Sequence, residues 1–180
     1  MARTGILLIS GSTRSGSTNT AALRTAQEVA PDDVGTFLYD GLAGLPAFNP
    51  DDDHDPLDPV VADLRSKISA ADAVLVCTPE YAGALPGSFK NLLDWTVGGS
   101  EMYGKPTAWI NVAAEGRGTL AHASLATVLG YVNAAVIEPA CQQIPVGRDA
   151  LGPHGTVAST DVRTRIAEVL TIVRDHVQSL

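Results

Sequence analysis

Short apolar runs alternate with segments of helical periodicity along the whole of this 180-residue chain. The apolar runs predict five strands, at residues 6–9, 35–39, 73–77, 107–112 and 134–137. The intervening patterns predict five helices, at residues 18–29, 60–70, 86–96, 119–132 and 160–180. Regular alternation of strand and helix indicates a parallel sheet, because parallel neighbours need a crossover connection.

The third predicted strand, Ala73–Cys77, is apolar at every position, which is typical of a strand buried on both faces. Five strands and five helices in alternation suit a flavodoxin-like fold. We therefore expect an α/β three-layer sandwich, with a five-stranded parallel sheet in the order 2-1-3-4-5 and helices on both faces. Residues 1–180 would form one domain. Ligands of this fold bind beyond the carboxyl ends of the strands, between strands 1 and 3.

The turn after the first strand carries the clearest chemistry. It places backbone N–H groups at the positive end of a helix dipole, where a phosphate is stabilised. Arg14 adds a guanidinium, and Ser12, Ser17 and Asn19 add neutral donors. The turn therefore predicts a phosphate site, and the alternative is a capped turn without a ligand. Its sequence is Gly11-Ser-Thr-Arg-Ser-Gly-Ser-Thr-Asn19.

The spacing of this turn approaches that of a nucleoside-triphosphate loop, but Ser17 stands where that loop has its lysine. No later apolar strand ends in an aspartate suited to magnesium, and the G-x-G-x-x-G dinucleotide pattern is absent. A nucleoside triphosphatase is thus disfavoured. A compact terminal monophosphate, surrounded by Arg14 and hydroxyl groups, fits better.

The loop after the third strand is the second polar, glycine-containing turn. Pro79 and Pro86 stiffen it, and Gly83 permits a close approach of the backbone. Its free amides could bind the edge of a flat heterocycle. Tyr81 is either an aromatic wall or a packing residue. Glu80 suits a hydrogen-bond acceptor that fixes the loop, or an interface residue, better than a ligand carboxylate.

Together the two loops resemble those of the NADPH-dependent FMN reductase family, which includes quinone, chromate and azo-dye reductases. The resemblance extends over most of the chain in order and spacing. The second motif that carries it is Pro79-Glu-Tyr-Ala-Gly-Ala-Leu-Pro-Gly-Ser-Phe-Lys-Asn-Leu-Leu-Asp-Trp95. The resemblance implies that the first loop holds the FMN phosphate and that the second holds the isoalloxazine edge. The residues expected to bind FMN are Ser12, Arg14, Ser17, Thr18, Asn19, Pro79, Glu80, Tyr81, Ala82, Gly83, Ala113, Glu115 and Gly116.

One position departs from the family pattern. Ala82 stands where the family usually has asparagine, so a side-chain contact or a loop-fixing bond is lost while backbone contacts survive. The third loop, residues 113–118, contains glycine as the family expects near the flavin pyrimidine. Arg117 in that loop either meets a phosphate of the nicotinamide nucleotide or is solvated.

The resemblance implies an FMN-dependent oxidoreductase that passes a hydride from NADPH or NADH through flavin N5 to a quinone, free flavin or similar acceptor. Ping-pong kinetics follow, and no side chain is expected to be catalytic because the flavin carries the chemistry. A flavin-binding electron carrier or sensor without turnover is the alternative, and a scaffold for another phosphate is a third. A homodimer or homotetramer is expected, with residues 95–103 as its surface.

Composition narrows the partners and the location. The net charge of −8 argues against nucleic acid and anionic membranes. Cys77 and Cys141 match no metal or redox spacing, which predicts reduced thiols in a cytoplasmic protein. No run is long enough for a signal peptide or a membrane span. The acidic residues 51–55 lack the spacing of a calcium loop, so no metal site is expected.

Overall fold

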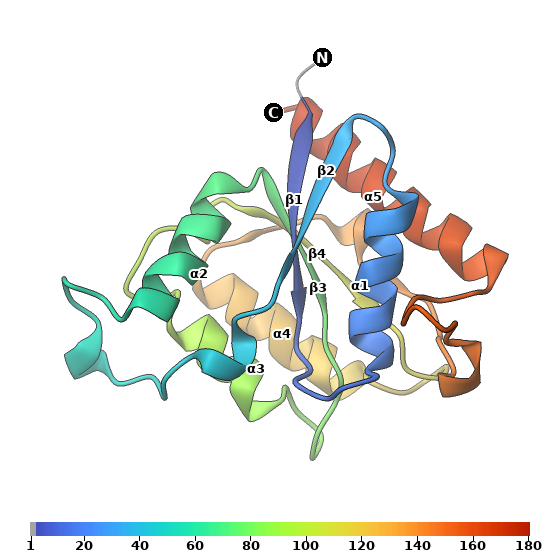
Figure 1. The fold of residues 1–180 in the computed structure, drawn as a ribbon. Coiled ribbons are helices and arrows are strands. Elements are labelled where there is room, and N and C mark those ends of the chain that lie inside the picture. The colour runs from blue at the N-terminus through green and yellow to red at the C-terminus, as the bar shows by residue number, and fades with distance from the viewer. Residues whose placement is uncertain (1–2) are drawn as a thin grey trace.

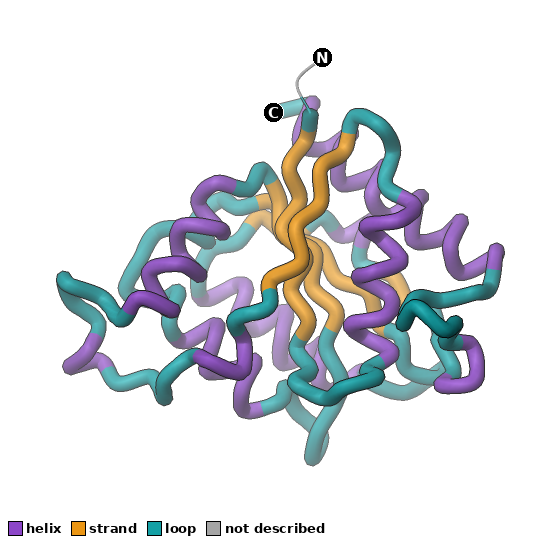
Figure 2. Tube along the Cα trace, in the orientation of Figure 1, coloured by secondary structure: helices purple, strands orange, loops and turns teal. Residues whose placement is uncertain are grey.

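A parallel sheet lies between two layers of helices in the computed structural model, which describes residues 3–180 (Figures 1 and 2). Its strands run in the order β2-β1-β3-β4-β5, with β6 also paired to β4, and every pair is parallel. The expected sandwich and strand order are confirmed. The strands are β1 (Thr4–Ser10), β2 (Val34–Tyr39), β3 (Ala73–Cys77), β4 (Pro106–Asn111), β5 (Ala135–Val136) and β6 (Gln142–Gln143).

The outer side of β4 differs from the expected single strand at 134–137. β5 has two residues and pairs with the start of β4, where Thr107 lies opposite Val136. A short 3-10 turn containing Pro139 follows, and proline cannot donate to a ladder. The chain then returns as β6, where Gln142 lies opposite Ile110. Two polar glutamines show no apolar pattern, so this sixth strand could not be predicted from hydropathy.

Five helices connect the strands close to the expected positions. Pro86 stands directly before its helix as the N-cap residue and not within the first turn. The Ser159 hydroxyl accepts a hydrogen bond from the Val162 N–H at the start of the last helix, as expected for a cap. The helices are α1 (Thr18–Val29), α2 (Pro59–Ala70), α3 (Gly87–Asp94), α4 (Thr119–Tyr131) and α5 (Thr160–Gln178).

The sheet separates two apolar cores. α1 and α5 cover one face, and α2, α3 and α4 cover the other (Figure 1). β3 serves both, because Leu75 and Cys77 belong to the first core while Val74 and Val76 belong to the second. All five β3 residues are buried, as predicted for a central strand. β1 and β3 are thus held rigidly at the middle of the molecule.

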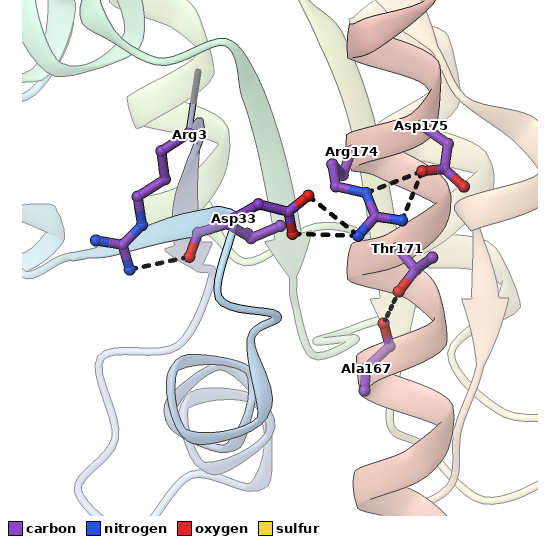
Figure 3. A network of polar contacts seen from close by, with 7 residues as sticks. Arg3, Asp33, Ala167, Thr171, Arg174 and Asp175 are labelled. Atoms are coloured by element: carbon purple, nitrogen blue, oxygen red, sulfur yellow. Dashed lines mark hydrogen bonds and ion pairs between the residues drawn. The ribbon is translucent and has the colours of Figure 1, made fainter. Parts of the chain in front are cut away.

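Polar contacts fasten α5 to the turn before β2 (Figure 3). Arg174 of α5 forms ion pairs with Asp33, at 3.2 Å, and with its neighbour Asp175, at 2.7 Å. Arg3 donates to the Val34 carbonyl at 3.1 Å beside them. These contacts lie at the amino end of β1, so they stabilise the scaffold away from the loops that follow β1 and β3.

Within residues 3–180, no helix combines the length and the apolar character that crossing a bilayer requires.

Candidate functional site

The loops that follow β1 and β3 emerge at one edge of the sheet and touch each other (Figure 1). Ser10 lies opposite Cys77 in the ladder, and the Gly11 N–H donates to the Cys77 carbonyl at 2.9 Å. A Cβ on Gly11 would stand only 2.6 Å from the Cβ of Thr78. Glycine is therefore required at position 11 for the two loops to meet.

Hydroxyl groups hold the first loop in shape. The Ser10 hydroxyl shares a 2.8 Å hydrogen bond with that of Thr20, and it accepts the Ser12 N–H at 3.3 Å. The Ser12 hydroxyl in turn accepts the Arg14 N–H at 3.3 Å. Gly16 turns the chain into α1 with a φ of +67°, which glycine adopts without strain. The expected phosphate ligand Ser12 thus also stabilises the loop.

The start of α1 is open to a ligand. The N–H groups of residues 15–20 form no hydrogen bond with any other part of the described chain, and the Ser17 side chain does not cap the helix. Ser17 is 7% exposed, and its hydroxyl has no partner within residues 3–180. Arg14 is exposed and forms no ion pair there. Donors and positive charge are left unused at one helix terminus, which suits an anion.

Two hollows flank this terminus. The larger, of about 300 Å³, lies toward β2 and includes Ser12, Arg14 and Asp40. The smaller, of about 80 Å³, lies toward residues 151–155 and includes Arg14 and Ser17. Three of the four expected phosphate ligands, Ser12, Arg14 and Ser17, therefore line these hollows. The fourth, Asn19, lines the cleft at the carboxyl edge of the sheet instead.

Asn19 is oriented by the strand beside it. The Cys77 thiol donates to Asn19 Oδ1 at 3.4 Å. Burial raises the pKa of the Cys77 thiol well above its ordinary value, so the thiol stays protonated and keeps its role as donor. The Asn19 amide nitrogen remains without a partner among the described residues, and Asn19 lines the cleft at the sheet edge.

The second loop is fastened by Glu80. Its Oε2 accepts the N–H groups of Leu120, at 3.0 Å, and Ala121, at 3.1 Å, at the start of α4. A carboxylate at a helix N-terminus is stabilising, so the side chain fixes the loop, which is the role that the sequence favoured. The Tyr81 backbone pairs with Ala84 across a tight turn, and the Tyr81 side chain is half exposed.

Ala82, where asparagine was expected from the resemblance, sits in the left-handed region with a φ of 51°. Alanine is strained in this region by about 1–2 kcal/mol, whereas asparagine tolerates it. We expect Ala82→Asn to raise the free energy of unfolding by about 0.5–1 kcal/mol, measured by urea denaturation. Ala84→Asn, two residues on, lacks a positive φ and is the control. Equal effects of the two substitutions would contradict the strain argument.

The third loop wraps around one buried side chain. Asn111, at the end of β4, accepts the Ala113 N–H at 3.0 Å and donates to the Arg117 carbonyl at 2.9 Å. Gly118 has a φ of +78°, and a Cβ there would stand 2.7 Å from Asn111 Oδ1. Asn111 thereby shapes the loop that the sequence assigned to the flavin pyrimidine.

The three loops enclose a polar cleft of about 330 Å³ at the carboxyl edge of the sheet. Of the expected FMN ligands, Thr18, Asn19, Pro79, Glu80 and Ala113 line it, and the other five in the second and third loops do not. Those five are Tyr81, Ala82, Gly83, Glu115 and Gly116. The complete lining is Thr18, Asn19, Thr78, Pro79, Glu80, Asn111, Val112, Ala113, Ala114, Arg117, Gly118, Val146 and Arg148.

Comparison with known protein families identifies the family of this chain. Residues 4–146 match the model of the NADPH-dependent FMN reductase family. The chain belongs to this family. It is therefore an oxidoreductase, and the family works with FMN and a reduced nicotinamide nucleotide.

Individual proteins similar to this chain are also oxidoreductases. An NAD(P)H-dependent FMN reductase of Pseudomonas aeruginosa is 33% identical over 178 residues, which are 97% of this chain and 96% of the relative. A 2-hydroxy-1,4-benzoquinone reductase of a Burkholderia species is 31% identical over 162 residues, with 88% and 87% covered. The structure of FerB, a flavoenzyme NAD(P)H:(acceptor) oxidoreductase of Paracoccus denitrificans, superposes with a TM-score of 0.76 at 26% identity, covering 96% and 98% of the chains.

The residues present fit the FMN of this reductase family. The unpaired N–H groups and the Ser17 hydroxyl at the start of α1 match the acceptors of a phosphate. Glu80 and Ala114 line the cleft, and their backbone N–H groups have no partner in the described chain, so these groups match the acceptors at the edge of a flat ring. Both sets of donors lie along one edge of the sheet.

Sequence reasoning missed part of the cleft. Asn111 is a polar residue at the end of an apolar strand, and that signal could have found it. Val146 and Arg148 follow β6, a strand without an apolar pattern, so nothing in the sequence pointed to them. The residues missed were Thr78, Asn111, Val112, Val146 and Arg148. Ala114 and Gly118 belong to the loop expected near the flavin pyrimidine but were not named as ligands, and Arg117 had been considered for the nucleotide.

Two further expectations concern residues outside the cleft. Trp95 is 1% exposed and donates to the Pro46 carbonyl at 2.9 Å, so it is a core residue rather than part of a subunit surface. Asp53 belongs to the acidic residues 51–55, whose pattern is typical of a solvated loop, but it forms a largely buried ion pair with Arg65 at 2.7 Å. That ion pair fixes the loop to α2. The sequence alone could not show that Arg65 lies beside Asp53.

His122 makes the stability of α4 sensitive to acid. It is buried, its Nδ1 lies 2.7 Å from the Gly118 carbonyl oxygen, and its Nε2 has no partner among the described residues. Burial lowers the pKa of His122, and the Gly118 carbonyl and the Glu80 charge oppose this only partly. Below about pH 6.5 the unfolded chain therefore binds more protons than the folded one, and stability falls with falling pH.

We expect His122→Asn to reduce this loss, because the asparagine amide can still donate toward the Gly118 carbonyl but does not titrate. The measurement is the free energy of unfolding in urea at pH 7 and pH 5. His154→Asn, at an exposed histidine, is the control. An unchanged pH dependence in His122→Asn, or an equal change in both variants, would contradict the assignment.

Proposed function

We propose that this chain binds FMN with its phosphate at the start of α1 and its ring in the cleft, and that it reduces a quinone, free flavin or similar acceptor with NADPH or NADH. The unpaired donors that run from the α1 terminus along the sheet edge to the third loop carry the proposal. A cleft of about 330 Å³ also lies within the usual range of small-molecule sites. Residues 1–180 would act as one flavin-binding domain.

Bound FMN would accept a hydride at N5 from the nucleotide and supply the electrons to the acceptor. The protein binds and orients. Arg14, Ser17 and the free amides of α1 hold the phosphate, and Pro79 keeps the second loop stiff against the ring. The N–H groups of Glu80 and Ala114 donate to the ring edge, where negative charge develops on reduction.

Nucleotide and acceptor would use the same exposed face of the ring in turn. The cleft at the carboxyl edge combines the proposed ring donors with open space, so the oxidised nucleotide would leave it before the acceptor enters. This predicts ping-pong kinetics. Parallel lines in double-reciprocal plots, at several acceptor concentrations, are the expected signature, and intersecting lines would contradict a shared position.

An anaerobic titration tests the proposed activity. The protein is loaded with FMN, and NADPH or NADH is added while the flavin absorbance near 450 nm is followed. We expect stoichiometric bleaching, followed by recovery of the colour when a benzoquinone is added. A yellow protein that neither nucleotide bleaches would instead be an electron carrier, and a protein that takes up no FMN would overturn both.

We also propose a homodimer, or a homotetramer built from it, through the surface around Tyr103. Val97, Tyr103 and Tyr131 are large apolar or aromatic side chains between 62% and 85% exposed, and they border a hollow of about 170 Å³. Exposed aromatic groups gathered in this way favour a protein contact. Light scattering should give twice or four times the 18.7 kDa of the chain, and a monomer at micromolar concentration would exclude the assembly.

A further inference from the structure

The FMN phosphate carries more negative charge than the expected ligands balance. A phosphate monoester has a charge between about −1.5 and −2 at pH 7. Arg14 is the one cation among the expected FMN ligands, and a helix N-terminus contributes roughly half a positive charge. Part of the phosphate charge is therefore left unbalanced, and a second cationic side chain would neutralise it.

Arg24 is placed to be that cation. It lies one turn after Thr20 on α1, and side chains four residues apart share a face and lean toward the helix N-terminus. Arg24 lines both hollows beside the first loop, together with Arg14 and Thr20. It forms no hydrogen bond or ion pair with its side chain anywhere in residues 3–180.

The smaller hollow is the better place for an anion. It is lined by both arginines and by Ser17, whose hydroxyl has no partner within residues 3–180, and no carboxylate lines it. The larger hollow includes the carboxylate of Asp40, which would repel a phosphate. Gly155 completes the smaller hollow, because a Cβ there would stand 3.0 Å from Arg24 Nη1. The Arg24 guanidinium therefore lies beside the Gly155 backbone.

We propose that Arg24 is a second cationic ligand of the FMN phosphate and makes the site select FMN over riboflavin. The inference rests on the proposed function. Arg24 and Arg14 approach the phosphate from α1 and from the loop, and Ser17 donates from between them. Arg24 is exposed, and its side chain forms no hydrogen bond or ion pair within residues 3–180, so its replacement should leave the fold intact.

The test compares FMN with riboflavin, which lacks the phosphate. Binding of each to the full chain is followed by flavin fluorescence. We expect Arg24→Gln to raise the Kd for FMN about 10- to 100-fold, the range of a lost charge-assisted hydrogen bond, and to leave the Kd for riboflavin unchanged. Arg24→Lys keeps the charge and should lose less. Arg163→Gln is the control: it removes a positive charge from α5, where Arg163 pairs with Glu28, and it should change neither Kd.

The outcomes distinguish a failure of the Arg24 inference from a failure of the proposed function. A wild-type chain that binds FMN, with an unchanged FMN Kd in Arg24→Gln, overturns the inference and leaves the proposed function standing. Equal losses for FMN and riboflavin overturn it as well, because the effect would not involve the phosphate. Unchanged FMN binding with a raised KM for NADPH but not NADH would assign Arg24 to the nucleotide instead. A wild-type chain that binds no flavin overturns the proposed function itself.

Discussion

Replacing Arg14 with alanine should weaken FMN binding by about 1.5–3 kcal/mol, roughly a 10- to 150-fold rise in Kd. The guanidinium is exposed, forms no ion pair within the described residues, and stands between two hollows at the start of α1. Its N–H groups are therefore free to donate to the ligand, and the fold does not depend on them. The thermal stability of the FMN-free protein should stay unchanged for the same reason.

Fluorescence titration with FMN and with riboflavin measures the Arg14 effect. Only FMN should lose affinity, because riboflavin has no phosphate for Arg14 to contact. Arg3→Ala provides a control at the opposite end of β1, where that arginine donates to the Val34 carbonyl. Unchanged FMN affinity in Arg14→Ala would remove Arg14 from the site.

Gly11→Ala should destabilise the protein by about 1–3 kcal/mol and lower Tm by roughly 2–12 °C. The new Cβ would stand 2.6 Å from the Cβ of Thr78 and 3.1 Å from a ring atom of Phe89. Phe89 is completely buried, so neither neighbour can move without disturbing the core of β3 and α3. The two loops would separate, and FMN affinity should fall with stability.

Thermal denaturation measures the Gly11 effect, and Gly87→Ala is the matched control. Nothing lies within 4 Å of a Cβ at Gly87, and its φ is not positive. Thr78→Ala in the Gly11→Ala background removes the nearest atom, Oγ1, and should recover only part of the loss, because the Cβ remains. A Tm of Gly11→Ala equal to that of Gly87→Ala would show that the loops do not meet as described.

The fold was largely predictable because its signals are local. A strand buried on both faces, such as β3, is apolar at each position. The buried residues of α5 recur at helical spacing in the sequence, and they are Val162, Ile166, Val169, Leu170 and Val173. The interrupted edge beside β4 was not predictable, because Gln142 and Gln143 pair through their backbone while their side chains follow no pattern. Polar strands held by tertiary pairing leave no mark on hydropathy.

A candidate site can be proposed from the sequence where one short segment carries it and not where distant segments converge. Ser12 to Asn19 form one turn, so a shared role in phosphate binding could be proposed for them from the sequence. The loop-fixing bonds from Glu80 to α4, and the enclosure of Asn111 by its own loop, depend on contacts between separate segments. Arg24 could not be singled out from the sequence for a related reason. A charged residue on an exposed helix face is usually just solvated, and only the structure shows the hollow beside it.

A crystal structure of the protein grown with FMN tests the account most directly. The account predicts the phosphate at the start of α1, within hydrogen-bond distance of Arg14, Ser17 and Arg24, and the ring in the cleft beside Pro79 and Ala114. FMN bound at another surface, or a phosphate turned away from α1, would contradict it.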